Sequence, residues 1–422
     1  MPRSIRTSVT RRSVIAGSLV SAVALGACTS TATASGTTSS STASTSTAQS
    51  TSASTSASAD TTNPPSAAQA LAENASASSV ADTDWSASDA VEITMSGDTA
   101  ASESEAVSVT DGTITISAAG VYRLTGEFDG SVEIAAPEDA QVVLILDDAS
   151  ITNDSGAAIL GTTADDLVIS LSGASSVTDS SSSAADSSAP NAAIYADMDL
   201  TITGDGTLTV SSVANDAIAS TDDLVIASGT ITASAGDDGL RGKDSLTIAS
   251  GSVSVDAGGD GLKSDEDEDA SAGYIAISGG SVSITAEGDG IAAQTDVILT
   301  GGTIDVEAGG GASAGKNADT STKGVKAGVY LIAEGATLDV DSGDDGLHSD
   351  GAIRLSSGTI TVATGDDGIH AEVAAVLDGA EVTVSQSNEG LEAGLITVAG
   401  GKVDITASDD GVNGSGSTTA EA

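Results

Sequence analysis

The chain has 422 residues and a formal net charge of −48, and only 1% of its residues are aromatic. Such a chain cannot build a thick core of large side chains, and its 39% of hydrophobic residues suit a thin core that repeats many times. The acidic balance argues against nucleic acid as a partner, because phosphate binding needs Lys and Arg. The single cysteine, Cys28, excludes a disulfide within the chain.

Residues 1–27 have the pattern of an export signal. A basic region from Arg3 to Arg12 precedes a short apolar stretch from Val14 to Leu25, which is too short to span a bilayer. Leu25-Gly26-Ala27-Cys28 then matches the bacterial lipobox, so we expect Cys28 to be lipidated. The paired arginines leave Sec and Tat export both open, and we expect an extracellular protein that is lipid-anchored to the bacterial cell membrane.

Residues 28–75 are rich in Ser, Thr and Ala and predict a disordered stalk between the lipid and the folded part. Residues 76–140 contain strand-like alternation, as in Thr113-Ile114-Thr115-Ile116, but lack the repeat that follows them. A solenoid must cover its open end, so this region is expected to form an irregular N-terminal β cap together with the first irregular strands.

From residue 141 to residue 414 the chain repeats itself, which outweighs every other signal. A hydrophobic residue marks each copy; it follows an Asp-Gly pair in six copies and a looser form, such as Asp216-Ala217 or Lys323-Gly324, in the others, and five of the ten gaps between successive markers are 22 residues. The three longest gaps contain insertions near 178–190, 265–271 and 307–322. The markers are Ile159, Ile194, Ile218, Leu240, Leu262, Ile291, Val325, Leu347, Ile369, Leu391 and Val412.

Each copy contains three short segments in which apolar residues alternate with polar ones. In one copy the apolar positions are Leu240, then Leu246 and Ile248, then Val253 and Val255, with Gly, Ser and Asp turns between them. Three strands per turn predict an all-β protein, a right-handed parallel β-helix with about 22 residues per coil. Residues 415–422 are expected to form a disordered tail.

In a β-helix, residues one coil apart stack about 4.8 Å apart, so the Asp of each Asp-Gly pair joins a column of carboxylates. Like charges this close repel by roughly 1 kcal/mol even in water, unless cations intervene. Carboxylates at glycine turns are ligands that Ca²⁺ prefers. The alternative is that Asp-Gly only makes a good turn, because both residues tolerate left-handed backbone. The predicted Ca²⁺ ligands are Asp216, Asp237, Asp238, Asp260, Asp289, Asp344, Asp345, Asp366, Asp367, Glu389, Asp409 and Asp410, and Lys323 is a built-in counter-ion.

The residue after each marker forms a second, outward column, which is often basic. One interpretation is a polar face that grips uronic acids or sugar hydroxyls, and the other is charge balance against the Asp column. The residues concerned are Arg241, Lys263, Lys326, His348 and His370.

The sequence contains no Ser/His/Asp grouping, phosphate-binding loop or Cys/His zinc motif, so we expect no enzyme. The run from Asp265 to Asp269 is interpreted as a solvated loop.

The segments Gly120-Val121-Tyr122-Arg123-Leu124-Thr125-Gly126, Val143 to Asp147, Gly156 to Ile159 and the Gly-Asp-Asp-Gly-Leu coils resemble the bacterial carbohydrate-binding domain-containing lipoproteins. The resemblance covers roughly residues 90 to 414. It implies a β-helix of pectate-lyase type that binds calcium and a polysaccharide, such as an acidic plant or cell-wall glycan, at the cell surface. The leading hypothesis is therefore non-catalytic, calcium-dependent polysaccharide binding. The alternatives are a structural surface adhesin and a pectate-type polysaccharide lyase.

Overall fold

The computed structural model describes residues 61–182, 184, 190–317 and 320–416. Within them, 31 strands form one sheet, and the helices are α1 (Ala67–Glu73) and the 3-10 helix η1 (Ala87–Asp89). All strand pairs are parallel except β1–β2 and β3–β4. The part of the chain described by the structure contains no helix that is long and apolar enough to cross a membrane.

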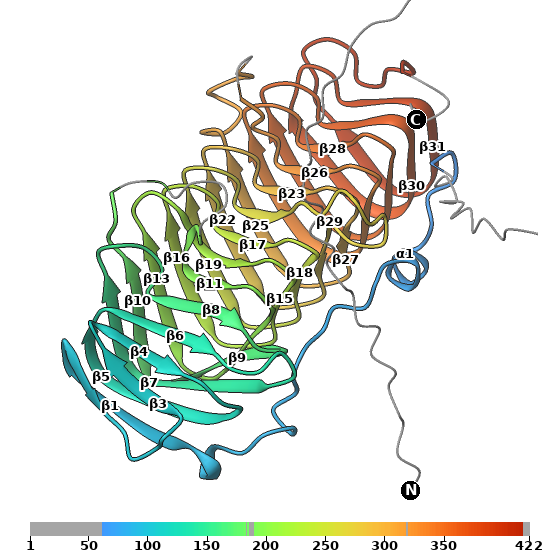
Figure 1. Ribbon diagram of the computed structural model, residues 1–422. Helices are drawn as coiled ribbons and strands as arrows, with labels where there is room; N and C mark the ends of the chain where they lie inside the picture. Colours follow the sequence, from blue (N-terminus) through green and yellow to red (C-terminus); the bar gives the residue numbers. More distant parts are fainter. Residues whose placement is uncertain (1–60, 183, 185–189, 318–319, 417–422) are drawn as a thin grey trace, which may run out of the picture. The chain divides into compact units, whose positions relative to one another are not determined.

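The parallel strands fall into three rows, because most strands pair with the third strand that follows in sequence (Figure 1). We call the chain between one strand and its partner in the same row a coil. Leu240 pairs with Leu262 in the first row, Leu246 with Ile275 in the second and Ser252 with Ser281 in the third. The stacking of one repeat on the next is therefore confirmed.

The bounds of the rows are as follows. The first row contains β8 (Ile159–Thr163), β11 (Ala192–Ala196), β14 (Asp216–Ser220), β17 (Leu240–Gly242), β20 (Leu262–Ser264), β23 (Ile291–Ala293), β26 (Val325–Ala327) and β28 (Leu347–Ser349). The second contains β9 (Asp166–Ser172), β12 (Asp199–Gly204), β15 (Asp223–Ile226), β18 (Ser245–Ile248), β21 (Tyr274–Ile277) and β24 (Val297–Leu299). The third contains β10 (Ala174–Asp179), β13 (Thr207–Ser212), β16 (Thr230–Ala235), β19 (Ser252–Ala257), β22 (Ser281–Ala286) and β25 (Thr303–Ala308). In the last coils the rows join into longer strands, β27 (Tyr330–Ser342), β29 (Ala352–Thr364), β30 (Ile369–Gln386) and β31 (Leu391–Ile405).

The earliest strands already belong to the parallel stack, within the region predicted to hold the N-terminal cap and the first irregular strands. They are β1 (Val91–Gly97), β2 (Thr99–Ala101), β3 (Val107–Thr110), β4 (Thr113–Ile116), β5 (Gly120–Asp129), β6 (Ser131–Ala135) and β7 (Gln141–Asn153). Strand β1 pairs in parallel with β5, and β4 with β6. Only the antiparallel additions of β2 and β3 depart from the stack, so the boundary at residue 141 has no counterpart in the pairing.

The core is a single column of aliphatic side chains inside the rows. In β19 the side chains of Val253 and Val255 are buried, whereas Ser252 and Ser254 between them are exposed, which is the alternation that a strand with one solvated face requires. The second inward-facing residue of each first-row strand, such as Gly242 in β17, is small because the chain turns tightly there. A Cβ atom on Gly242 would lie 2.0 Å from the carbonyl oxygen of Ser245.

The glycine of each Asp-Gly pair has a reason that differs from the predicted one. Gly239, Gly261 and the later copies do not have positive φ, so the left-handed turn is not what selects them. A Cβ on Gly239 would lie 2.2 Å from a methyl carbon of Val255 and 2.5 Å from the carbonyl oxygen of Gly261 in the next coil. From Gly239 to Gly390, glycine is required because successive coils approach each other too closely for a side chain, whereas a Cβ on Gly411 in the last copy would meet nothing within 4 Å.

Residues 61–90 form a strap over the second row, in place of part of the predicted stalk. Helix α1 buries Ala67 and Ala70 against Ile298, Tyr330 and Val373. The chain then runs toward the N-terminal coils, where Val80 packs on Val143 and Val168 (blue in Figure 1). The prediction of disorder was wrong for residues 67–73, because two small alanines one turn apart fit an apolar patch that the sequence pattern did not reveal.

Candidate functional site

The carboxylates that precede the first row form the predicted column, which we call the ladder. One oxygen of each acid accepts the backbone N–H of the corresponding residue in the next coil. The N–H of Asp260 lies 2.8 Å from Asp238 Oδ1, and that of Asp289 lies 2.9 Å from Asp260 Oδ1. This oxygen therefore has a structural role, and the second oxygen of these acids has no such backbone contact.

Lysine ammonium groups contact the second oxygen in the middle of the ladder. Lys263 Nζ lies 2.9 Å from Asp238 Oδ2 and 3.1 Å from Asp260 Oδ2, so it bridges two rungs. Lys326 Nζ lies 3.5 Å from Asp289 Oδ2. The charge-balance interpretation of these two residues is thus realised, although both side chains stay partly exposed, at 30% and 37%.

Farther along, two lysines occupy the group formed by Asp344, Asp345 and Asp366. Lys323 Nζ is 2.6 Å from Asp344 Oδ2 and 3.2 Å from Asp345 Oδ2, as expected for a built-in counter-ion. Lys316 Nζ lies 3.0 Å from Asp344 Oδ1 and 2.5 Å from Asp366 Oδ2. The position that a cation would take at this group is therefore held by the protein's own ammonium groups.

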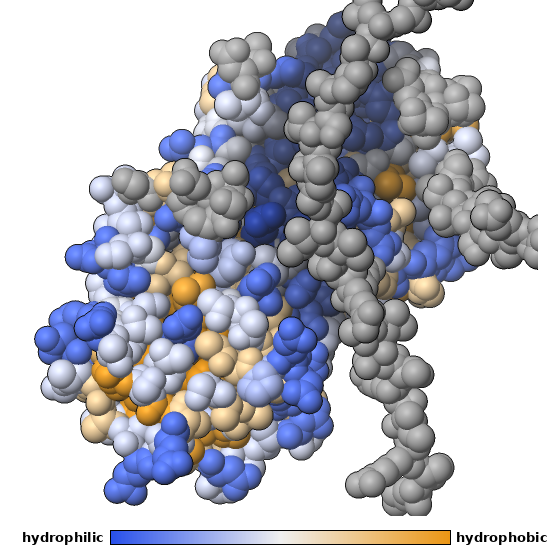
Figure 2. Space-filling view, viewed as in Figure 1, coloured by the Kyte–Doolittle hydropathy of each residue, from blue (hydrophilic) through white to orange (hydrophobic). Residues whose placement is uncertain are grey.

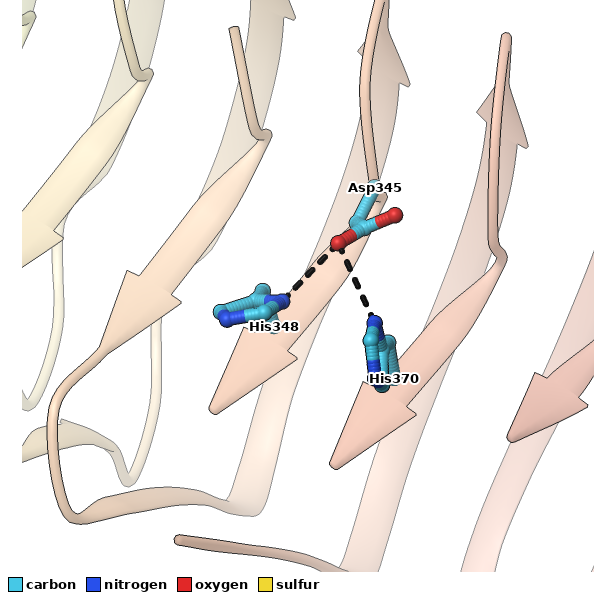
Figure 3. A group of neighbouring side chains, drawn as sticks. All are labelled: Asp345, His348 and His370. Carbon is cyan, nitrogen blue, oxygen red and sulfur yellow. Dashed lines mark hydrogen bonds and ion pairs between the residues drawn. The ribbon is translucent and has the colours of Figure 1, made fainter. Parts of the chain in front are cut away.

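The two histidines of the chain meet at the same rung (Figure 3). His348 Nδ1 lies 2.8 Å and His370 Nδ1 3.4 Å from Asp345 Oδ2. Burial alone would raise the pKa of Asp345, but hydrogen bonds from His348 and His370 and the charge of Lys323 hold it below its ordinary value. The same carboxylate raises the pKa of His370, and at His348 burial lowers the pKa but Asp345 and Asp350 together outweigh it and raise the pKa.

Carboxylates also gather at the two ends of the ladder, although in the first group Asp238 Oδ2 contacts Lys263 and Asp216 Oδ2 accepts Asn191 Nδ2 at 2.9 Å. The first group is Asp216, Asp237 and Asp238, and the second is Asp367, Glu389 and Glu392, with one oxygen of each member within 4.8 Å of the others. Burial, then Asp238 and Asp237, raises the pKa of Asp216 to about 7. Burial, then Asp345 and Asp366, raises the pKa of Asp367 to about 7. All-oxygen donor sets with excess negative charge fit Ca²⁺.

The remaining predicted ligands do not join such a group within the described residues. Asp260 and Asp289 hold Lys263 and Lys326, as described above. Asp409 and Asp410 are exposed in the last turn of the chain, beyond β31. Glu392 was not predicted, because the outward column carries bases in the preceding coils and its change of sign had no signal in the repeat. A count of charges coil by coil would have found it.

Two clefts flank Lys263 and Lys326 where insertions interrupt the repeat. The larger has a volume of about 660 Å³; Ala292 lies in its lining between the two lysines, and the loop 265–270 lies along it. The other, of about 580 Å³, is bordered by Asn317, Thr320 and Ser321 of the next insertion. Repeat insertions that gather on one face are typical of a binding face.

The loop from Asp265 to Asp269 is more ordered than a solvated loop. Glu266 is buried, contacts Lys243 and accepts the backbone N–H of Glu268 at 2.7 Å. Arg241 donates from Nε to both oxygens of Asp265 at 3.1 Å. Of the five basic residues predicted to bind carbohydrate, therefore, Lys263 and Lys326 line the clefts, Arg241 supports the loop, and the histidines contact Asp345.

The outward column of the first row changes character along the stack. Leu160, Tyr195 and Ala219 precede Arg241 and Lys263 in successive coils. In Figure 2 the surface over β4, β6 and β8 accordingly includes hydrophobic residues, whereas the surface of the later coils is mainly hydrophilic. The outward column of the first row thus passes from Leu160, Tyr195 and Ala219 to charged residues in the later coils.

Comparison with known proteins agrees with this architecture. Residues 110–368 match the carbohydrate-binding domain-containing protein family. A protein of that name from Acetivibrio thermocellus is 33% identical over 137 residues, which is 31% of this chain and 48% of the relative, so the match spans about half of the relative. The gadolinium derivative of a polysaccharide lyase-like protein from C. thermocellum has a TM-score of 0.50 and 24% identity, over 73% of this chain and 100% of that chain, and it shares the fold. The chain belongs to the carbohydrate-binding domain-containing protein family.

Proposed function

We propose that this protein binds a polysaccharide along the first row, in the clefts beside Lys263 and Lys326, and that Ca²⁺ supports the binding. The observation that carries the proposal is the position of the two insertions, which border clefts on one face where the small Ala292 leaves the strand surface open. The family's description and the lyase-like name of the structural neighbour support the same ligand class.

The charge of the larger cleft limits which class of polysaccharide can bind there. Eight carboxylates and two ammonium groups line it. A polysaccharide that carries carboxylates would be repelled by this surface unless divalent cations bridge the two, whereas sugar hydroxyls can donate to the acids directly. The two lysines, two rungs apart, offer the positive groups that a uronic acid needs. An acidic glycan, held by the two lysines and by Ca²⁺ that binds together with the glycan, is therefore the proposed ligand.

A binding role is favoured over a lyase role by the state of Lys263. A lyase of this kind needs a basic Lys or Arg, and burial would help by lowering the pKa of Lys263, but Asp238 and Asp260 outweigh burial and raise it above its ordinary value. An ammonium group held in this way is a poor general base at neutral pH. The proposal is therefore non-catalytic binding.

Binding is tested by pull-down of the purified chain with polygalacturonate and neutral polysaccharides, in Ca²⁺ and in chelator. We expect retention on the acidic polymer in Ca²⁺, with loss in chelator and in the Lys263→Ala/Lys326→Ala variant. Lys402→Ala, in an exposed pair with Glu381, is the matched control. No retention in either condition would leave the spacer or adhesin function, and absorbance from an unsaturated uronide would establish a lyase.

The fold and the location are proposed as predicted from the sequence. Parallel strands joined coil by coil are expected to wind as a right-handed β-helix. Cys28 and the export signal lie outside the described residues, and we propose that lipid on Cys28 anchors the protein at the outer face of the membrane. Labelling of cells with a fatty-acid analogue, with Cys28→Ser as the control, tests the anchor.

Calcium is proposed to bind at the two ends of the ladder, at Asp216, Asp237 and Asp238 and at Asp367, Glu389 and Glu392. Binding to the folded state alone stabilises it by about 2.7 kcal/mol when the ion is at a hundredfold excess over its Kd. Chelator should therefore lower the melting temperature, and Ca²⁺ should restore it more fully than NaCl of equal ionic strength. An unchanged melting temperature would remove calcium from the proposal.

A further inference from the structure

The rung at Asp345 differs from every other rung of the ladder in its chemistry. His348 of β28 and His370 of β30 are paired in register, so their rings lie on successive coils. Their centroids are 5.0 Å apart and their planes are nearly perpendicular, at 85°. Both Nδ1 atoms face one oxygen of Asp345, which is itself only 2% exposed (Figure 3).

We propose that Asp345, His348 and His370 form a binding site for Zn²⁺ or a similar transition metal, distinct from the calcium sites proposed above and independent of them. Two imidazole nitrogens and one carboxylate oxygen are a donor set that suits Zn²⁺, Cu²⁺ or Ni²⁺, whereas Ca²⁺ takes oxygen ligands. The three donor atoms lie within 4.8 Å of one another.

The distances fit a small metal ion. Two bonds of about 2.0 Å at a tetrahedral angle place ligand atoms about 3.3 Å apart. The 3.4 Å between His370 Nδ1 and Asp345 Oδ2 has this length, and the 2.8 Å between His348 Nδ1 and the same oxygen needs to open by about half an ångström. A water molecule would complete the coordination.

The surroundings supply a second, independent observation. Histidines that bind metal usually direct their other ring nitrogen to a carboxylate, which fixes the ring. His348 Nε2 lies 3.0 Å from Asp350 Oδ1, and His370 Nε2 lies 3.8 Å from Glu372 Oε1. Both rings therefore have a carboxylate on the side away from Asp345. Charge balance alone needs one base beside Asp345 and does not explain this paired outer arrangement.

The ammonium group of Lys323 opposes metal binding at this rung. Lys323 Nζ lies 3.2 Å from Asp345 Oδ2 and must move toward Asp344, where it already has a contact of 2.6 Å. Removal of this ammonium should tighten metal binding. Lys323→Met is expected to lower the Kd for Zn²⁺ about tenfold, because a like charge leaves the site.

The test is calorimetric titration of the metal-free, untagged chain with Zn²⁺, together with the visible spectrum of bound Co²⁺. We expect one tight site whose affinity falls about 100-fold in His348→Ala and in His370→Ala and about tenfold in Asp350→Asn. Lys402→Ala is the control, and excess Ca²⁺ should not displace Zn²⁺. Equal Zn²⁺ affinity in the double histidine variant, displacement by Ca²⁺, or no tight site would each overturn the proposal. Circular dichroism of each variant confirms that the fold is kept.

Discussion

Two columns of stacked aspartates in this molecule deal with the same repulsion in different ways. The ladder lies at the start of the first row, and its acids contact lysines, histidines and, by our proposal, metal ions. The second column, which we call the strap column, lies at the start of the second row, where Asp166, Asp199 and Asp223 stack in successive coils and Asp296 follows after Ser245 and Tyr274. Here the strap covers the acids: Ser78 N–H lies 2.7 Å from Asp223 Oδ2, and Asn74 Nδ2 lies 3.1 Å from Asp296 Oδ2.

The difference lies in what compensates the buried charge. In the strap column hydrogen bonds replace cations, and burial raises the pKa values of Asp166, Asp223 and Asp296 to about 6. In the ladder, Lys323 and the histidines outweigh burial and hold the pKa of Asp345 below its ordinary value. Stacked aspartates in a repeat protein therefore do not by themselves indicate a cation site, and the neighbouring elements decide.

The largest expected loss of stability is at Asp238, which both accepts a backbone N–H and contacts a lysine. Asp238→Ala leaves the N–H of Asp260 without its acceptor at 2.8 Å and Lys263 without one of its carboxylates. The free energy of unfolding should fall by about 3 kcal/mol. Asp238→Asn keeps an oxygen acceptor and should lose less than half as much. Denaturant unfolding in chelator measures both, and equal losses would show that the hydrogen bond contributes nothing.

The next largest loss of stability is expected where the strap docks on the second row. Ala70 is 1% exposed against Tyr330 and Val373, so Ala70→Asp should detach α1 at a cost of about 2 kcal/mol. Limited proteolysis should then cut residues 61–75 much faster. Leu71→Asp, at a residue 40% exposed on the same helix, is the matched control and should leave the cleavage rate unchanged. Equal cleavage of both variants would mean that α1 does not depend on this contact.

The strap column also has a signal in the sequence. Ala164-Asp165-Asp166-Leu167 and Thr221-Asp222-Asp223-Leu224 have the same paired acids, without the glycine that marked the ladder. The repeat period placed the rows and the ladder correctly, because residues 22 apart must stack. It could not place the strap, since docking of α1 depends on two alanines and a patch assembled from four strands. The repeat period also could not predict that Lys263 contacts both Asp238 and Asp260.

The strap column also predicts a pH dependence with a definite sign. Burial raises the pKa of Asp296 from 3.8 to about 6, against hydrogen bonds from Asn74 and Tyr330 that lower it. The folded state therefore keeps a proton that the unfolded chain releases, and this contribution to stability is lost as pH rises from about 4 through 6. Asp296→Asn should be more stable than the wild type at pH 8 by about 1 kcal/mol, and the difference should fade toward pH 4. Thermal melts across this range decide, and a constant difference would contradict the shift.

The smallest expected effect tests whether a lysine and a metal ion are interchangeable on the ladder. Lys263→Gln removes the ammonium that bridges Asp238 and Asp260, and in chelator the free energy of unfolding should fall by somewhat less than about 1 kcal/mol, since the side chain is partly solvated. In millimolar Ca²⁺ the loss should disappear, because the exposed pair of oxygens joins Asp216 and Asp237 as an enlarged oxygen site. Lys402→Gln, which breaks the exposed pair with Glu381, should show no dependence on Ca²⁺. Ca²⁺ could instead stabilise the wild type and fail to restore the stability of Lys263→Gln. In that case the geometry of the ladder distinguishes an ammonium group from a metal ion, and the lysines are structural parts of the coil, not substitutes for an ion.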